Sequence, residues 1–180
     1  LFRSMLKTVL ENFKGTIVVD ADGLNLLSAH KELLAAGGIS RQTGNIALVI
    51  TPHVKEMSRL TGKTVAELKE APVRECRAFA EVETLVCVSK DARTCVSDGG
   101  VHTYMNTSGN DGMATAGSGD VLAGMIAGLS AGGISPTEAA RLGVYIHGLA
   151  GDRAKKRYGK AAITAGSLID EIGPIMSSYV

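Results

Sequence analysis

Three short apolar runs, separated by amphipathic sequence, constrain the fold more than any other feature. The runs are TIVVD (16–20), IALVI (46–50) and LVCV (85–88). They are rich in Val and Ile, which favour buried strands, and they are too short to be helices. Helical spacing of apolar residues falls between them at 30–36, 54–61 and 64–82, the last with an expected interruption at Pro72. This alternation predicts an α/β fold in which helices cover both faces of a mostly parallel sheet.

The rest of the chain predicts a β-hairpin followed by helices. RTCV and VHTY flank the turn Ser97–Gly100, a pattern typical of a hairpin. Further helices are expected at 1–13, from Ser118, at 136–156, at 166–172 and at 174–179, the last two separated at Gly173–Pro174. In the helix from Ser118, a thin face is expected for close packing, made of Ala123, Gly124, Ala127 and Gly128. No linker divides the sequence, so residues 1–180 are predicted to form a single domain.

The charge balance excludes some classes of function. The 180 residues include 19 Lys and Arg against 18 Asp and Glu, for a formal net charge of +1. A chain this close to neutral is not expected to bind nucleic acid or an anionic membrane through a broad basic surface. With 45% apolar and 21% charged residues, the composition is that of a globular domain with its own core.

The cysteines and the apolar stretches bear on cellular location. Cys76, Cys87 and Cys95 are odd in number and lack C-x-x-C spacing. We therefore expect core residues in a reducing compartment, with neither a disulfide framework nor a zinc site. The longest mostly apolar stretch begins at Val121 and is too short and too rich in glycine to cross a bilayer. These features predict a cytoplasmic protein.

A glycine-rich segment, NTSGNDGMATAGSGDVLAG (106–124), is the most informative part of the sequence for function. It ends where a helix is expected to begin, so free N–H groups and the positive end of the helix dipole point to one spot. This arrangement predicts an anion site. Asp120 falls in the first helical turn, where a carboxylate is stabilised and can accept a proton from a substrate hydroxyl. The alternative is a plain glycine turn capped by Ser118.

Two common phosphate-binding loops are excluded. A Rossmann G-x-G-x-x-G would need glycine at position 122, which is Leu122, and no strand leads directly into this loop. A Walker A loop would need glycine five residues before Gly62-Lys63 or Gly159-Lys160, and neither pair has it.

Two polar clusters follow the first two expected strands. His53 and Glu56 emerge in ITPHVKEMSRL, and Asp20, Asp22 and Asn25 in VVDADGLNLL. Ligand sites of open α/β sheets gather at such carboxyl ends of strands, and paired carboxylates suit a metal or a substrate hydroxyl. Helix capping and turn formation explain both clusters about equally well.

The remaining candidates carry less information. Lys90 and Arg93, in VSKDART, suit a phosphate, or equally a solvated turn. His147 lies within an apolar helix and is expected to be packed, and His30 and His102 are expected at the surface. The basic residues Arg153, Lys155, Lys156 and Arg157 are explained by the dipole at a helix C-terminus.

Five segments, in chain order, resemble one family. They are DADGLN, TPHVKEMSRLTG, SKDART, GNDGMATAGSGDVLAGMIAGL and HGLAGD. The family is the ADP/ATP-dependent NAD(P)H-hydrate dehydratases, carbohydrate-kinase-related members of the ribokinase-like superfamily. The resemblance runs from about Gly15 to the C-terminus. GSGD alone marks only the superfamily, whereas its combination with TPH-x-x-E and GMAT is much more specific.

The resemblance implies a three-layer ribokinase-like sandwich and a lyase that repairs a damaged cofactor. Such enzymes phosphorylate the hydroxyl of S-NADHX or S-NADPHX and expel phosphate, which restores NAD(P)H. The GMATAGSGD form implies ADP rather than ATP as donor, giving AMP and phosphate. By the same resemblance, Asp120 takes the hydroxyl proton, and Glu56 falls where the superfamily keeps a carboxylate associated with Mg2+.

The resemblance also implies binding residues. For the nucleotide these are Lys90, Asp91, Ala92, Arg93, Thr94, Gly117, Ser118 and Gly119. For the hydrate they are His53 and Asp120, to which we add Asp22 and Asn25 from the neighbouring strand end.

The sequence departs from the family at three positions and in length. Asp91, Asp111 and Ala116 stand where the family commonly has glycine, proline and glycine. Asp91 adds a negative charge beside a phosphate-binding turn, which is expected to weaken nucleotide binding. The family's domain carries a further N-terminal portion that this sequence lacks. We therefore expect one open sheet edge, and a chain that is a fragment or one piece of an assembly.

Two other functions fit the same residues. One is a ribokinase-like kinase that stops after phosphorylating a small alcohol. The other is a non-catalytic nucleotide-binding piece. A homo-oligomer is expected from related bacterial enzymes, and an epimerase domain fused upstream is a further expectation from some relatives.

Overall fold

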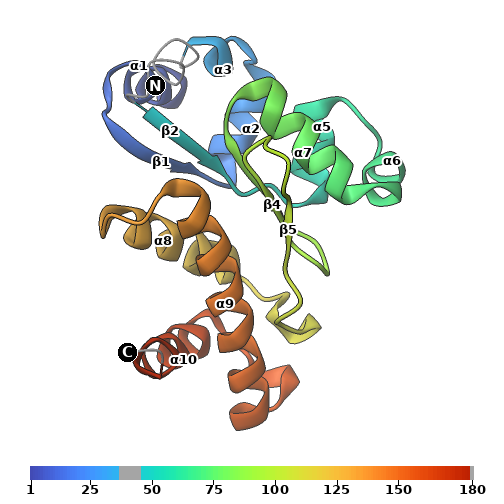
Figure 1. The fold of residues 1–180 in the computed structure, drawn as a ribbon, viewed down its shortest axis with the longest axis vertical. Helices are drawn as coiled ribbons and strands as arrows, with labels where there is room; N and C mark the ends of the chain where they lie inside the picture. Colours follow the sequence, from blue (N-terminus) through green and yellow to red (C-terminus); the bar gives the residue numbers. More distant parts are fainter. Residues whose placement is uncertain (37–45, 179–180) are drawn as a thin grey trace.

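The sheet contains five strands in the order of the sequence (Figure 1). The computed structural model describes residues 1–36 and 46–178. The strands are β1 (Gly15–Val19), β2 (Ile46–Ile50), β3 (Val86–Ser89), β4 (Cys95–Ser97) and β5 (Tyr104–Met105). β1, β2 and β3 are parallel, and β4 and β5 continue the sheet antiparallel. This confirms the predicted sheet, although the hairpin closes through a longer loop, 98–103, than the turn at Ser97–Gly100.

Helices cover both faces of the sheet. One face carries α1 (Phe2–Asn12), α2 (Asp22–Ala29), α3 (Glu32–Ala36), α5 (Val54–Thr61), α6 (Val65–Glu70) and α7 (Pro72–Glu83). The other carries α8 (Ser118–Ala131) and α9 (Pro136–Tyr158), and α10 (Ala165–Ser177) packs on α9. Two 3-10 turns, η1 (Asp111–Met113) and η2 (Lys160–Ala162), flank these helices. The predicted α/β architecture with helices on both faces is therefore confirmed.

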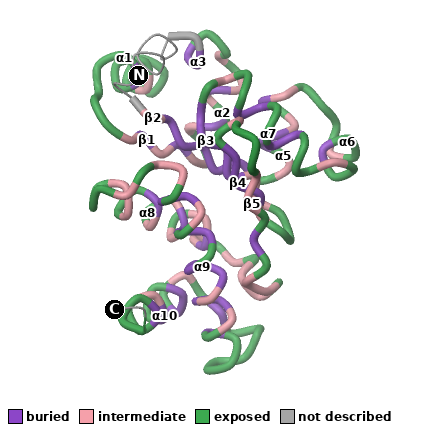
Figure 2. Tube along the Cα trace, viewed as in Figure 1, coloured by how far each residue is buried: buried purple, intermediate pink, exposed green. Residues whose placement is uncertain are grey.

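Strand residues alternate between two cores, as the pleat of a sheet requires. Leu48 and Ile50 of β2 pack with the helices of the first face, while Val49 between them packs against α8 and α9. Figure 2 shows the central strands β2, β3 and β4 as mostly buried. Because helices cover both faces of the sheet, the strands have apolar residues on both sides and appear in the sequence as continuous apolar runs.

Pro72 separates α6 from α7 as expected, and it occupies the first turn of α7. The predicted break at Gly173–Pro174 is wrong, because α10 continues through Pro174. A proline inside a helix removes one backbone hydrogen bond. Burial of Leu168 and Ile175 on the same helix offsets that loss. Residue 179, the end of the second short helix predicted here, lies outside the described residues.

Small residues of α8 do not pack closely, contrary to expectation. Gly124, Ala127 and Gly128 are exposed. A methyl group added at either glycine would meet no atom within 4 Å in the part of the chain that the structure describes. The sequence pattern is that of a packing face, and the described residues leave it uncovered.

The basic residues at the end of α9 do more than complement the helix dipole. Arg153 and Arg157 donate to the two oxygens of Glu171 at 3.0 and 3.1 Å. Glu171 is buried on α10. The helix dipole alone therefore does not explain these charges, since two of them join α9 to α10.

The cysteines and His147 are buried as predicted, and all three cysteines are free thiols. His102 is exposed and His30 half-buried. Across residues 1–36 and 46–178, the structure has no helix long and apolar enough to span a membrane.

Candidate functional site

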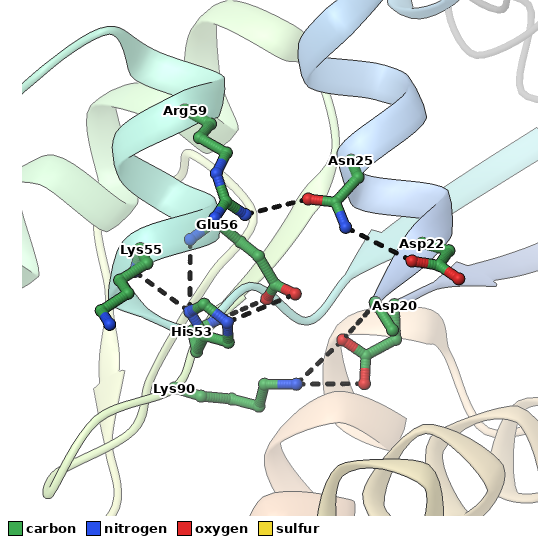
Figure 3. A network of polar contacts seen from close by, with 9 residues as sticks. Asp20, Asp22, Asn25, His53, Lys55, Glu56, Arg59 and Lys90 are labelled. Carbon is green, nitrogen blue, oxygen red and sulfur yellow. Dashed lines mark hydrogen bonds and ion pairs between the residues drawn. The ribbon is translucent and has the colours of Figure 1, made fainter.

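Polar side chains gather where β1, β2 and β3 end (Figure 3). The parallel pairing of β2 and β3 extends past the strands, because the Lys90 N–H donates to the Pro52 carbonyl at 2.7 Å. His53 then pairs with Lys90 as an isolated bridge. Two residues that the sequence placed in separate clusters thus lie side by side.

His53 begins α5 and is held by that helix. Its Nδ1 accepts hydrogen bonds from the N–H groups of Lys55 and Glu56 at 3.1 and 3.2 Å. The Glu56 carboxylate accepts in return from the His53 N–H at 2.8 Å, which completes a capping box. Because Nδ1 acts as an acceptor, the neutral ring carries its proton on Nε2. This N–H lies 3.5 Å from Glu56 Oε1, and since the side chain is 49% exposed, a ligand can also reach it.

Asn25 is fixed by its neighbours on α2 and α5. Arg59 donates to its side-chain oxygen at 2.9 Å, and its own amide donates to Asp22 at 3.4 Å. Both Asp22 and Asn25 are exposed at the rim of the network. Asp22 does not cap α2, whose N-cap is Ala21. The capping alternative for this cluster is therefore wrong.

Lys90 forms a bidentate ion pair with Asp20. Its Nζ lies 2.9 and 3.0 Å from the two carboxylate oxygens. The side chains of Lys90 and Asp20 are only 21% and 13% exposed. One Asp20 oxygen also accepts from the Ala21 N–H at 2.9 Å. The pair joins the ends of β1 and β3.

The amino end of α8 approaches this ion pair. A Cβ atom at Gly119 would lie 3.3 Å from both Asp20 Oδ2 and Lys90 Nζ. Gly117, the N-cap, has a left-handed φ of 82° that glycine adopts without strain. Asp120 is exposed in the first turn of α8, as predicted. The first turn of α8, where helix N–H groups lack intrahelical partners, therefore lies beside the Lys90 ammonium.

Ser118 is not the helix cap that the alternative interpretation required. It is the first residue of α8 and is buried, with its Oγ 3.3 Å from His147 Nε2 on α9. The pKa of His147 is lowered to about 4, mainly by burial; a hydrogen bond with the Ser118 backbone opposes the shift, and the nearby Lys90 charge adds to it. His147 is therefore neutral at pH 7 and joins α9 to the start of α8.

The glycine-rich loop is fastened to α9. Gly109 N–H and the Asn110 side chain donate to the two oxygens of Asp152 at 2.9 and 3.0 Å. Ser108 Oγ donates to the Tyr145 carbonyl at 3.0 Å. The buried Asn106 donates to Ser108 O at 3.0 Å. These contacts fix the loop that leads into α8.

Two glycines of α9 allow the loop to lie this close. A Cβ at Gly148 would lie 2.1 Å from Ser108 Oγ and 2.8 Å from its backbone C and O. A Cβ at Gly151 would lie 2.1 Å from the Met113 sulfur. The HGLAGD segment (147–152) thus acts through one helix face: His147 contacts α8, both glycines admit the loop, and Asp152 binds it. Sequence reasoning used this segment only as a family marker.

The other predicted nucleotide residues line the turn after Lys90. Asp91, Ala92 and Arg93 are exposed and Thr94 is half-buried. Asp91 accepts from the Ala92 N–H at 2.8 Å and lies 3.7 Å from Lys69. The negative charge that departs from the family pattern is therefore partly offset by a lysine.

An open hollow of about 390 Å3 borders the glycine-rich loop. It is lined by Asp111, Gly112, Ala114, Thr115, Lys160, Ala161 and Ile163. Its volume lies in the range of small-ligand sites. The loop thus has the α8 end and the ion pair on one side and this hollow beside it.

The described carboxylates do not build a metal site of their own. Within residues 1–36 and 46–178, no three His, Cys, Asp or Glu side chains are grouped to hold a metal ion. Glu56, the residue expected near Mg2+, uses one oxygen for the His53 N–H and has the other 3.5 Å from His53 Nε2.

The profile of the NAD(P)H-hydrate dehydratase family matches residues 2–174. The chain belongs to this family. The match includes every segment of the site described above, from the end of β1 to α9.

Relatives of known name agree with this assignment. The chain is 42% identical over 167 residues to a bifunctional NAD(P)H-hydrate repair enzyme of Moorella thermoacetica, covering 92% of this chain and 30% of the relative. It is 40% identical over 158 residues to an ADP-dependent (S)-NAD(P)H-hydrate dehydratase of Neisseria meningitidis, covering 88% and 51%. The chain of this dehydratase family therefore spans about a third to a half of these relatives.

A solved structure has the same fold. It is an ADP/ATP-dependent NAD(P)H-hydrate dehydratase from Bacillus subtilis, co-crystallised with ATP and Mg2+ and soaked with CoA. The TM-score is 0.78 at 22% identity, over 97% of this chain and 72% of that one. The ribokinase-like fold predicted for this family member is thereby confirmed.

The structure brings only part of the predicted site residues of this dehydratase-family chain together in one network. His53, Glu56, Asn25, Asp22 and Lys90 belong to the network of Figure 3. Gly119 lies next to it, since an added Cβ there would be 3.3 Å from both Asp20 Oδ2 and Lys90 Nζ. Sequence reasoning left Arg59 and Asp152 out. The only signal for Arg59 is its place one and a half turns after His53 on the same helix, and for Asp152 its place in HGLAGD.

Proposed function

We propose that this chain supplies the dehydratase activity of an NAD(P)H-hydrate repair enzyme. ADP phosphorylates the hydroxyl of S-NADHX or S-NADPHX, giving AMP and a phosphorylated hydrate. Loss of phosphate and a proton from that intermediate restores the reduced nicotinamide. The observation that carries the proposal is the meeting of Lys90 and the amino end of α8 beside His53.

The anion site supports phosphoryl transfer. Free N–H groups at the start of α8 and the Lys90 ammonium both attract phosphate oxygens. Transfer of a phosphoryl group depends mostly on positioning and on charge stabilisation, which fixed donors of this kind supply. The loop before α8 is held by Asp152 and the two α9 glycines, so the donors are in place before a ligand arrives. The hollow beside the loop offers room for the nucleoside.

Two residues have separate roles toward the hydrate. Asp120 is an exposed carboxylate in the first turn of α8, suited to accept the hydroxyl proton as the phosphoryl group arrives. His53 presents an Nε2–H donor that orients the substrate, because its Nδ1 is occupied by the helix. Asp22 and Asn25 lie at the rim next to His53 and are proposed to contact the hydrate (Figure 3).

Magnesium is proposed to enter with the nucleotide. Mg2+ usually keeps several waters and binds substrate phosphates plus one or two carboxylates. In the part of the chain that the structure describes, carboxylates do not group to hold it, and the phosphates are its main ligands in this proposal. That the Bacillus relative was co-crystallised with ATP and Mg2+ supports the pairing of the ion with the nucleotide.

The test is an absorbance assay on the protein as expressed from its gene. S-NADHX or S-NADPHX is mixed with Mg2+ and either ADP or ATP, and the reduced-nicotinamide band is followed together with released phosphate. We expect both to rise with ADP. Asp120→Asn should lower the rate about 10²- to 10⁴-fold while the protein still binds ADP.

Other outcomes identify the competing functions. A phosphorylated product that accumulates without the nicotinamide band indicates a kinase that stops after transfer. ADP binding without turnover of either hydrate indicates a nucleotide-binding piece. An unchanged rate for Asp120→Asn removes Asp120 from the role of base.

A further inference from the structure

We propose that Asp20 is a positioning residue for phosphoryl transfer, which holds the Lys90 ammonium against the amino end of α8. The inference rests on the proposed function. Asp20 directly follows β1, and Lys90 directly follows β3, and β2 lies between these two strands in the sheet. The two residues belong to different sequence motifs, so only the tertiary structure brings them into contact.

The contact restrains a flexible side chain. A lysine has four rotatable bonds, and an unrestrained ammonium would sample many positions over the site. Both carboxylate oxygens of Asp20 accept from Lys90 Nζ, at 2.9 and 3.0 Å, so the ammonium is held between two acceptors. An ammonium has three donors. Two of them go to Asp20, which leaves one for a phosphate oxygen.

Asp20 is itself held by its own backbone. The Ala21 N–H donates to its Oδ1 at 2.9 Å. Ala21 has φ 49° and ψ −117°, a conformation that a residue with a Cβ rarely adopts. Such backbone strain persists where the surrounding structure requires it. The carboxylate is therefore anchored independently of Lys90, as a positioning group needs to be.

Gly119 places the ion pair next to the reacting groups. A Cβ atom there would lie 3.3 Å from both Asp20 Oδ2 and Lys90 Nζ, so the pair packs directly on the first turn of α8. Asp120, the proposed base, is the next residue. Asp20 thus aims a positive charge at the place where the transferred phosphoryl group develops charge.

This role predicts opposite effects on binding and on turnover. A negative charge beside an anion site repels the nucleotide, so Asp20→Asn should leave the KM for ADP unchanged or lower it. The same change frees the Lys90 ammonium and should lower kcat about ten- to hundredfold, since small misplacements of a catalytic group have effects of this size. A purely structural role would raise KM and lower kcat together.

The experiment is a double-mutant cycle in the protein as expressed from its gene, with Asp20→Asn, Lys90→Met and both. If Asp20 acts through Lys90, the double variant has the kcat of Lys90→Met within about twofold. A matched control is Glu32→Gln, which removes the charge from the exposed Arg3–Glu32 ion pair on α3 and should leave kcat unchanged. Equal melting temperatures establish that the variants are folded.

Two results would overturn the proposal. One is a kcat for Asp20→Asn equal to that of the unaltered protein, and the other is losses that multiply in the double variant. If the unaltered protein restores no reduced nicotinamide, the proposed function fails, and ADP binding by calorimetry decides the positioning role separately. Lys90→Met should then weaken ADP binding more in the protein that keeps Asp20 than in the Asp20→Asn variant. Where Asp20 is kept, loss of Lys90 leaves its carboxylate unpaired beside the phosphates of ADP. Equal effects in both backgrounds would refute it.

Discussion

Replacing Gly148 by alanine tests whether α9 holds the glycine-rich loop in place. The new Cβ would lie 2.8 Å from the backbone C and O of Ser108, where ordinary contact begins near 3.4 Å. Rotation of the Ser108 hydroxyl cannot relieve a backbone contact, so the loop must move by more than half an ångström. That movement also stretches the hydrogen bond from Ser108 to the Tyr145 carbonyl.

The magnitude follows from three opposing contributions. Overpacking costs about 1–3 kcal/mol, and one weakened hydrogen bond costs about 1 kcal/mol. The better helix propensity of alanine returns about 1 kcal/mol. We expect Gly148→Ala to lower the free energy of unfolding by about 1–3 kcal/mol. Because the loop leads directly into the anion site, we also expect turnover of the hydrate to fall about 10²-fold.

Gly151→Ala is the matched control, on the same helix and facing the same loop. Its new Cβ meets only side-chain atoms of Met113, and a methionine side chain rearranges readily. Both variants gain the same helix propensity, so the difference between them reports the cost of moving backbone. Urea unfolding and the nicotinamide absorbance assay measure it. If Gly151→Ala is as damaging as Gly148→Ala in either assay, the loop is not held in the way described.

The other predictions concern two histidines and the loop anchor. His53→Asn should keep the α5 cap and stability, but its shorter side chain has no donor at the position of Nε2, so binding of the hydrate should weaken. His53→Gln should place a donor near that position but lose the cap, at about 1 kcal/mol in urea unfolding. The opposite pattern contradicts the assigned tautomer. Because the folded state holds His147 with a pKa near 4, against 6.5 for the unfolded chain, the unfolded state binds the extra proton. The free energy of unfolding should therefore fall by about 3 kcal/mol in all as the pH drops from 6.5 to 4. In the His147→Gln variant, the difference between the free energies of unfolding measured at pH 7 and at pH 5 should be smaller. Asp152→Asn replaces a carboxylate oxygen that accepts from the loop by an amide N–H2 that cannot accept. We expect this change to raise the KM for ADP. An unchanged KM would show that Asp152 does not support the nucleotide site.

Local pattern alone predicted much of the fold. The strands at 16–20 and 46–50 and the helix that begins at Ser118 correspond to β1, β2 and α8 within a residue. These elements follow from neighbouring residues: β-branched runs covered on both faces, and glycines that end at a helical segment. The prediction at Pro174 is wrong because a local rule on proline takes no account of the burial of Ile175, the next residue of α10.

Local pattern also located most of the site but not its connections. Asp20 and Lys90 were each singled out, for a metal or hydroxyl and for phosphate, yet the structure pairs them with one another. HGLAGD marked the family, and only its packing explains why glycine is required at Gly148. The homo-oligomer, the roles of the site residues and the open sheet edge stay predictions.

By itself, then, the sequence determined most of the elements, the family and the position of the glycine-rich loop, because those depend on residues close together in the chain. The tertiary structure decided which groups meet: Asp20 with Lys90 across the sheet, His147 with Ser118 between helices, and Asp152 with the loop. Such contacts join residues 29 to 70 positions apart. Their partners are set by strand order and helix packing, which only the folded chain establishes.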